Sequence, residues 1–189
     1  MTEEQRYNSL RTNKLHLPFL DRAVHFLVVH FLLMISLAAL FIIAYIYIGT
    51  RSGKLVLYNK DAYNIPSWVA LVSVILAFPA YRLQANRLKF KEVHTTLTRD
   101  QIVDIIEKVG EKLKWHPDEV AANFIIAKTF RFFPFRFFFW EVWGEQITIL
   151  FDSNRILINS ISRKGSLVSY GHNKKNVNRL VEEIEKASR

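Results

Sequence analysis

The chain of 189 residues contains no cysteine. Disulfide bonds, metal sites built from thiolates and a cysteine nucleophile are therefore excluded. Common enzyme motifs are missing as well, since there is no Walker-type phosphate loop, no G-x-S-x-G turn and no H-E-x-x-H metal motif. The histidines outside the apolar runs are scattered and have no Asp or Glu at ligand spacing: His16, His94, His116 and His172. We therefore expect no metal, no cofactor and no catalytic residue, and favour a protein that is not an enzyme, although a site assembled only in three dimensions would leave no such motif.

Acidic residues are also in short supply, with 17 Asp and Glu against 26 Lys and Arg, which makes the formal net charge +9. A basic chain can indicate nucleic-acid binding, but Lys and Arg that flank membrane segments produce the same excess. The chain has no basic and aromatic signature with glycines of the kind that RNA-binding domains carry. Nucleic acid is therefore not an expected partner.

Charge is absent altogether from residues 23–48, the longest apolar run. As a helix this run would be about 39 Å long, which exceeds the roughly 30 Å hydrocarbon core of a bilayer. It begins after 22 mostly polar residues and lacks a cleavage pattern, which indicates a retained anchor rather than a signal peptide. A second run, residues 65–81, is short and contains Pro79, so spanning would depend on snorkelling by Arg82 or on a thinner bilayer. We expect two transmembrane helices, with a re-entrant second segment as the alternative.

Lys and Arg in the flanks predict the orientation of this hairpin. Four precede the first run, three lie in the connection and four follow the second run: Arg6, Arg11, Lys14 and Arg22; Arg51, Lys54 and Lys60; Arg82, Arg87, Lys89 and Lys91. The two outer flanks together outweigh the connection, which favours a multi-pass protein of the cell inner (plasma) membrane with both termini in the cytoplasm. The expected divisions are a cytoplasmic N-terminal segment (1–22), an external loop (49–64), a basic stalk (82–95) and a cytoplasmic α+β domain (96–189).

Two histidines lie in or beside the first apolar run. His25 and His30 are five residues apart, which places them about 140° from each other on a helix, so they do not form a two-ligand metal face. We expect His25 at headgroup level and His30 packed within the helix bundle. The alternative is a proton-linked or cofactor-binding site, since ionisable groups inside a membrane are candidates for function.

The polar C-terminal half reads as an α+β domain. Thr98 followed by Gln101 is a capping-box signal, and it predicts a helix over residues 99–113. A strand is expected over 120–130, and two alternating runs around residues 152–154 indicate a β-hairpin. A last helix is expected over 173–187, with Asn173 as its N-cap. This order implies an antiparallel sheet with helices on one face.

Residues 130–143 are the least ordinary stretch, because nine of these fourteen residues are Phe or Trp. The rings could form the core of a small sheet whose strand is interrupted at Pro134. They could instead form a ridge in the membrane interface, or a surface for a partner protein. The candidates for a membrane- or partner-facing role are Phe132, Phe133, Phe135, Arg136, Phe137 and Trp140.

Residues 162–175 could bind an anion. They place basic residues and glycines in a turn and at the start of the last helix, where free N–H groups and the helix dipole favour phosphate or a lipid headgroup. The candidates are Arg163, Lys164, Gly165, Ser166, Gly171, His172, Asn173 and Lys174. The alternative is structural: the two glycines relieve tight turns, Asn173 caps the helix and the lysines are solvated.

The same stretch carries a resemblance. Residues 160–165 read S-I-S-R-K-G, and residues 169–173 read S-Y-G-H-N ahead of the final helix. This resembles the ending R-S-x-S-R-x-G and S-D-x-G-x-N of an uncharacterised family of small bacterial and plastid domains. The resemblance covers residues 96–187 at most, and Asn159 and Tyr170 depart from the pattern. It implies a similar α+β fold and no particular reaction.

The sequence therefore predicts an integral membrane protein whose cytoplasmic α+β domain acts as a binding module, as an adaptor or as a subunit of a membrane complex. The expected partners are a bilayer with anionic headgroups and a protein of the same complex. The alternative is a membrane-surface enzyme or sensor that binds a phosphorylated or lipidic ligand at residues 162–175.

Overall fold

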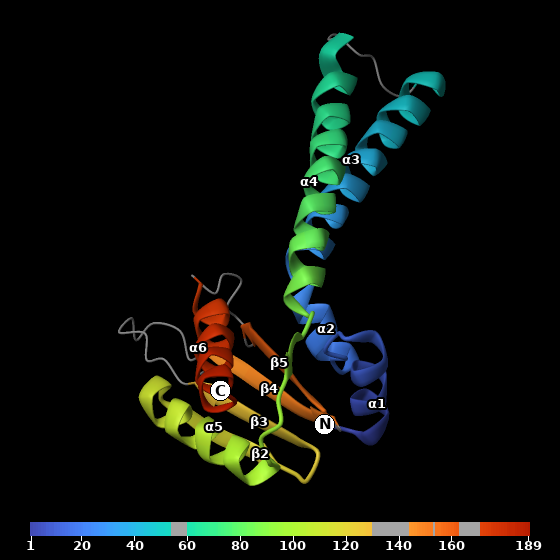
Figure 1. The fold of residues 1–189 in the computed structure, drawn as a ribbon. Helices are drawn as coiled ribbons and strands as arrows, with labels where there is room; N and C mark the ends of the chain where they lie inside the picture. Colours follow the sequence, from blue (N-terminus) through green and yellow to red (C-terminus); the bar gives the residue numbers. More distant parts are fainter. Residues whose placement is uncertain (54–59, 130–143, 153, 163–170) are drawn as a thin grey trace, which may run out of the picture. The chain divides into compact units, whose positions relative to one another are not determined.

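The computed structural model describes residues 1–53, 60–129, 144–152, 154–162 and 171–189 (Figure 1). The chain divides into two compact units. We call Met1–Arg22 together with Asn86–Arg189 the α+β unit, and Ala23–Ala85 the hairpin unit. Two ends of the chain that are far apart in sequence therefore fold together.

The α+β unit is built on a five-stranded antiparallel sheet with the order β1-β5-β4-β3-β2. The strands are β1 (Lys91–His94), β2 (Trp115–Val120), β3 (Phe124–Thr129), β4 (Glu145–Asp152) and β5 (Arg155–Ser162). The predicted α+β class with an antiparallel sheet is confirmed, as is the β-hairpin around residues 152–154.

Both edge strands differ from the sequence-based expectation. Residues 91–94 were expected in a basic stalk but pair with β5, because Val93 reaches the core while its charged neighbours point outward. Residues 115–118 were expected only to break the preceding helix, yet β2 spans residues 115–120 and pairs with β3 around a bulge near Pro117. The strand expected over residues 120–130 begins later, as β3 at Phe124. Short, charged strands and a bulged proline are typical of sheet edges, where they discourage pairing with other chains, and they make an edge strand hard to recognise from its pattern.

Two helices, α5 (Arg99–Leu113) and α6 (His172–Ala187), cover one face of the sheet (Figure 1). The bounds of α5 are those predicted, and the capping box between Thr98 and Gln101 is present. The core beneath these helices contains isoleucine and leucine side chains with almost no exposure: Ile147, Ile149, Ile158, Leu180 and Ile184.

The N-terminal segment, with α1 (Glu3–Thr12), packs against the opposite face. Leu15 is only 4% exposed there and belongs to a second core with Phe90, Leu150 and Leu157. Only one face was expected to be covered, and residues 1–22 were expected to form a separate, partly ordered segment. The apolar second face of β4 and β5 explains the difference, since it needs a cover that α5 and α6 do not provide.

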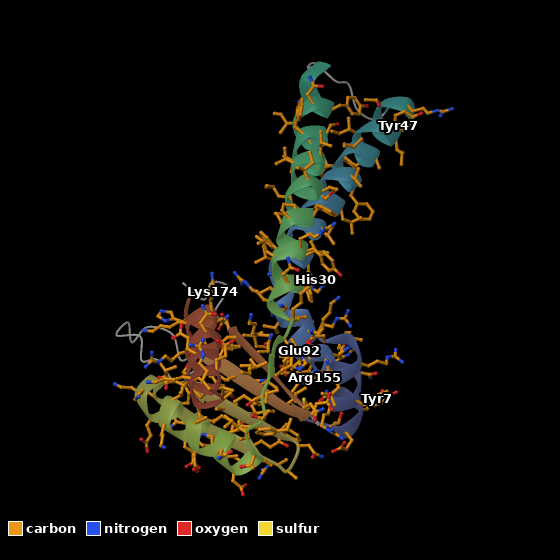
Figure 2. All side chains as sticks on the ribbon, viewed as in Figure 1. Tyr7, His30, Tyr47, Glu92, Arg155 and Lys174 are labelled. Atoms are coloured by element: carbon orange, nitrogen blue, oxygen red, sulfur yellow. The ribbon has the colours of Figure 1, made fainter. Side chains whose placement is uncertain are left out.

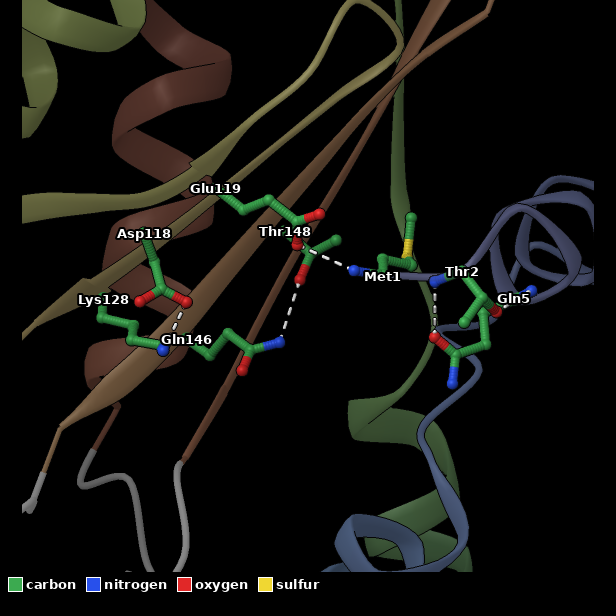
Figure 3. A network of polar contacts seen from close by, with 8 residues as sticks. All are labelled: Met1, Thr2, Gln5, Asp118, Glu119, Lys128, Gln146 and Thr148. Atoms are coloured by element: carbon green, nitrogen blue, oxygen red, sulfur yellow. Dashed lines mark hydrogen bonds and ion pairs between the residues drawn. The ribbon is translucent and has the colours of Figure 1, made fainter.

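Polar contacts also fasten the N-terminal segment (Figure 3). The amino group of Met1 donates a hydrogen bond of 2.7 Å to the Glu119 carboxylate on β2. Thr2 and Gln5 form a capping box at the start of α1. Close by, Lys128 of β3 pairs with Asp118 of β2.

We call residues 13–15 and 88–90 the neck, because they are the paired segments that precede and follow the hairpin. The amide of Leu15 donates to the carbonyl of Leu88 at 2.7 Å, and the amide of Phe90 donates to the carbonyl of Asn13 at 3.2 Å. The Asn159 side chain on β5 donates to the carbonyls of residues 87 and 89 at 2.9 and 2.8 Å. Through these two hydrogen bonds, strand β5 holds the second segment of the neck against the sheet.

Helices α3 (Leu27–Arg51) and α4 (Asn64–Arg87) dominate the hairpin unit, with α2 (Phe19–His25) leading into α3 and a 3-10 turn, η1 (Lys60–Tyr63), leading into α4. Both long helices are apolar and long enough to cross a membrane, judged by length and composition. The 24 residues of α4 continue through Pro79 and give a helix of about 36 Å.

The two histidines of the hairpin differ in burial. His25 is partly buried, and its Nε2 lies 2.9 Å from the carbonyl oxygen of Gln84 on α4. His30 was expected to pack within the bundle, but it is exposed on α3, as is Tyr47 (Figure 2). The buried positions of the two long helices are occupied mainly by small residues, and His30 is not among them.

Candidate functional site

The most polar part of the α+β unit's interior lies where the end of β5 meets the start of α6. Ser160 and Ser162 alternate with apolar residues along β5 and lie on its α6 side. Asn173 and Asn176 are three residues apart, so they share the face of α6 that meets this strand.

These four residues form what we call the serine–asparagine cluster. Ser160 Oγ donates to Asn173 Oδ1 at 3.2 Å, and Asn173 Nδ2 donates to Ser162 Oγ at 3.3 Å. Asn176 Nδ2 donates to Ser160 Oγ at 3.4 Å. Asn173 is only 8% exposed. Because buried polar groups require partners, this mutual bonding fixes the start of α6 on β5.

A second buried polar pair lies at the same end of the sheet. Glu145 is 5% exposed, and its carboxylate accepts a hydrogen bond from the Thr129 hydroxyl. Its amide donates to the same hydroxyl oxygen at 2.8 Å. A Cβ atom on Gly144 would lie 1.8 Å from the carbonyl oxygen of Thr129, so only glycine fits at that position. Since Glu145 is the register partner of Ser162, the pair and the cluster occupy neighbouring strands.

Hydrogen bonds connect these groups across neighbouring elements, which is the pattern of a structural clasp. Within the described ranges, no group of three or more His, Asp or Glu residues could hold a metal ion. The serine–asparagine cluster therefore holds the start of α6 on β5, while Leu180, Val181 and Ile184 pack the rest of the helix against the sheet.

The structure describes only part of the predicted anion site. Arg163, Lys164, Gly165 and Ser166 lie outside the described residues. Asn173 is not the N-cap, because Gly171 holds that position with a φ of 81°, a left-handed conformation that favours glycine. The Asn173 side chain turns inward to the two serines instead.

What remains of the anion site is the exposed start of α6. This helix has no side-chain N-cap and no acidic residue in its first turn. His172 is partly exposed, and Lys174 is exposed at this end of the helix (Figure 2). Of the expected eight-residue site, the described part is therefore a helix start without a side-chain cap, with the exposed residues Lys174 and Lys175 in its first turn.

The predicted membrane- or partner-facing residues, Phe132, Phe133, Phe135, Arg136, Phe137 and Trp140, all lie outside the described residues. The residues on either side of their segment are described, and Gly144 lies against Thr129.

Two features were not found by sequence reasoning. Asn176 was not recognised as part of the cluster, because its i, i+3 spacing from Asn173 shows only that the two asparagines share a helix face, and the serines are brought to that face by the fold. The pairing of the neck was missed because a strand pair between residues 13–15 and 88–90 leaves no local pattern.

No family model matches this chain, and no curated protein and no solved structure matches it either. The resemblance to the small bacterial and plastid domains therefore stays a prediction. Three residues that carry it, Ser160, Ser162 and Asn173, are members of the serine–asparagine cluster.

Proposed function

We propose that this chain is an integral membrane protein in which α3 and α4 cross the bilayer as a hairpin. The α+β unit lies at one membrane surface and acts as a binding module, either as an adaptor or as a subunit of a membrane complex. The proposal concerns a binding role and includes no reaction.

The main observation that supports this proposal is the distribution of side-chain sizes between the buried and exposed positions of the hairpin. The buried positions are mostly small: Ser36, Ala39 and Gly49 on α3, and Ala70, Ser73 and Ala77 on α4. Large apolar side chains point outward, with Phe41 67% exposed and Phe78 63% exposed. A hairpin in water would bury its large apolar groups, whereas a hairpin in lipid packs through small residues and presents large ones to the acyl chains.

A polar link inside the hairpin supports the same environment. Ser36 Oγ donates to the carbonyl oxygen of Ala70 at 3.3 Å, across the two helices. Serine hydroxyls that bond across helices are a common device in membrane bundles. Exposed Tyr45 and Tyr47 near one end of α3 and Trp68 near the start of α4 have the amphipathic character of interfacial residues.

The two chain segments that make up the α+β unit support the placement of both termini on the same side of the membrane. Residues 1–22 precede the hairpin and residues 86–189 follow it, yet they fold as one unit. Two spans return the chain to the side from which it started, so this joint unit is compatible with a hairpin and not with a single span. The excess of Lys and Arg in these flanks favours the cytoplasmic side.

Membrane extraction tests the proposal. The full chain is expected to stay in the membrane fraction after an alkaline carbonate wash. A matched variant, in which a flexible linker of about ten residues replaces residues 23–85, is expected to be soluble and folded, since the neck already brings the linker's ends together. Release of the full chain by the wash would contradict the proposal.

The alternative role is a sensor or enzyme that binds a phosphorylated or lipidic ligand at residues 162–175. The uncapped start of α6 with exposed Lys174 is the observation that favours it. Under this alternative, Lys174→Ala together with His172→Ala removes function but leaves complex formation intact. Under the proposed binding role, the same double variant retains function.

A further inference from the structure

We propose that the neck is a binding site for the headgroups of anionic phospholipids, formed by Lys14 and Lys89 with Lys91 beside them. This inference rests on the proposed membrane hairpin and adds the residues and the lipid class to it. A phosphodiester that carries one negative charge is the ligand chemistry, and the bilayer is its source.

The pairing of two lysines is the first observation. Lys14 and Lys89 are direct partners in an isolated antiparallel bridge, and the flanking backbone hydrogen bonds of 2.7 and 3.2 Å fix them there. Like charges directly opposite each other on paired strands are destabilising. A bound anion between the two ammonium groups would turn this repulsion into attraction.

The second observation is that, within the described part of the chain, the three ammonium groups are not paired, which is not the same as a lack of acidic residues nearby. Lys14, Lys89 and Lys91 are exposed, and among the described residues none of them forms an ion pair with a carboxylate. The sequence from residue 82 to residue 91 contains no Asp or Glu. The carboxylate of Glu92, which follows Lys91 in the sequence, is engaged by Arg155 at 3.1 Å. Arg155 also pairs with Asp152 at 2.8 Å, and these hydrogen bonds, Asp152 first, raise the pKa of that arginine above its usual value.

The length of chain between the neck and the hairpin is the third observation. Arg82 is the first charged residue after the apolar part of α4, and the helix continues to Arg87. Five helical residues and two extended ones span at most about 15 Å, so Lys89 lies within that distance of Arg82 in any orientation of the two units. Lys14 shares this location only because it pairs with Lys89.

The distance of at most about 15 Å between Arg82 and Lys89 is comparable with the depth over which a membrane surface attracts a charged group. Headgroups occupy about 5–8 Å on each side of the hydrocarbon core, and the Debye length at physiological salt is about 8 Å. Lysine side chains at the neck are therefore held within the attractive field of an anionic leaflet. An acidic protein or a nucleic acid would also be attracted to these charges, but the short tether favours the lipid.

Lipid binding to the full-length protein in detergent tests the inference. Native mass spectrometry would count adducts of phosphatidylglycerol and, as the uncharged comparison, phosphatidylcholine. Phosphatidylglycerol is expected to bind preferentially, and the double variant Lys14→Gln with Lys89→Gln is expected to weaken it about 25-fold, or about fivefold for each lysine.

A control variant that loses the same two positive charges elsewhere distinguishes a specific lipid site from general electrostatic attraction to anionic lipid. Lys108→Gln with Lys112→Gln removes two exposed lysines of α5 and is expected to leave phosphatidylglycerol binding unchanged. Equal losses in the two double variants, or equal binding of the two lipids, would overturn the inference. So would displacement of the lipid by millimolar inorganic phosphate, since the site would then serve free phosphate. If the full chain stays in the membrane after the carbonate wash but fails these lipid-binding tests, the neck site is contradicted and the membrane hairpin is not.

Discussion

At the scale of single residues, Asn173 shows how a residue expected to contact a ligand takes a structural role. Asparagine is among the preferred N-cap residues, and its position before an amphipathic run predicted a cap. The structure places it two residues after the N-cap, in the first turn of α6, where it is bonded to Ser160 and Ser162. The sequence could not indicate this, because the serines are brought within reach only by the fold.

The first prediction follows from that role. Asn173→Ala removes one hydrogen-bond partner from the buried Ser160 hydroxyl and one from the partly buried Ser162 hydroxyl, and it is expected to lower the free energy of unfolding by about 1–3 kcal/mol. Lys174→Ala, an exposed neighbour on the same helix turn, is expected to change it by less than about 0.5 kcal/mol. Urea unfolding of the soluble variant that lacks residues 23–85, followed by tryptophan fluorescence, measures both. A larger loss for the lysine variant would show that the cluster is not the clasp described above.

At the level of helices and strands, the elements with strong local sequence patterns were predicted correctly and those with weak patterns were missed. Helix α5 has a capping box and an apolar stripe, and its bounds were predicted correctly. The β4–β5 hairpin has alternating strands around a turn, and it was also predicted correctly. Strands β1 and β2 have charged residues and a proline, and their place in the sheet depends on partners far along the chain, so they were missed.

The second prediction concerns the element that covers the other face of the sheet. Leu15→Ala is expected to cost about 2–4 kcal/mol of unfolding free energy, because it opens a cavity against Leu150 and Leu157. Leu20→Ala makes the same truncation in a leucine that is 69% exposed, and it is expected to change the free energy of unfolding little. Thermal unfolding of the full chain in detergent compares the two. Equal midpoints would mean that the N-terminal segment does not contribute to the core.

The third prediction concerns the seam of the hairpin. Ala77→Leu places a large side chain at a buried position of α4, and overpacking is expected to lower stability by about 1–3 kcal/mol. Leu76→Ala changes the outward face, where lipid or detergent fills the space, and is expected to be tolerated. The fraction that stays monodisperse by size-exclusion chromatography after heating measures both. A greater loss for Leu76→Ala would indicate that the outward face packs against protein.

At the scale of the whole molecule, the joint folding of residues 1–22 with 86–189 is the feature with the widest consequences. A fragment that begins at residue 92 would lack the N-terminal segment and Phe90, so the second core would face water. Apolar surface exposed in this way favours aggregation and lipid binding by itself. The hairpin-replaced variant is therefore the appropriate soluble form of the α+β unit.

The most direct test of the membrane hairpin uses the absence of cysteine, since any single introduced thiol is then a unique label. Glu4→Cys, Ser52→Cys and Lys186→Cys place thiols at exposed positions in α1, beyond the end of α3 and in α6. An impermeant maleimide applied to intact bacterial cells is expected to label residue 52 alone, and residues 4 and 186 only after lysis. Labelling of residues 4 and 186 from opposite sides, or of all three before lysis, would contradict a two-span protein with its α+β unit in the cytoplasm.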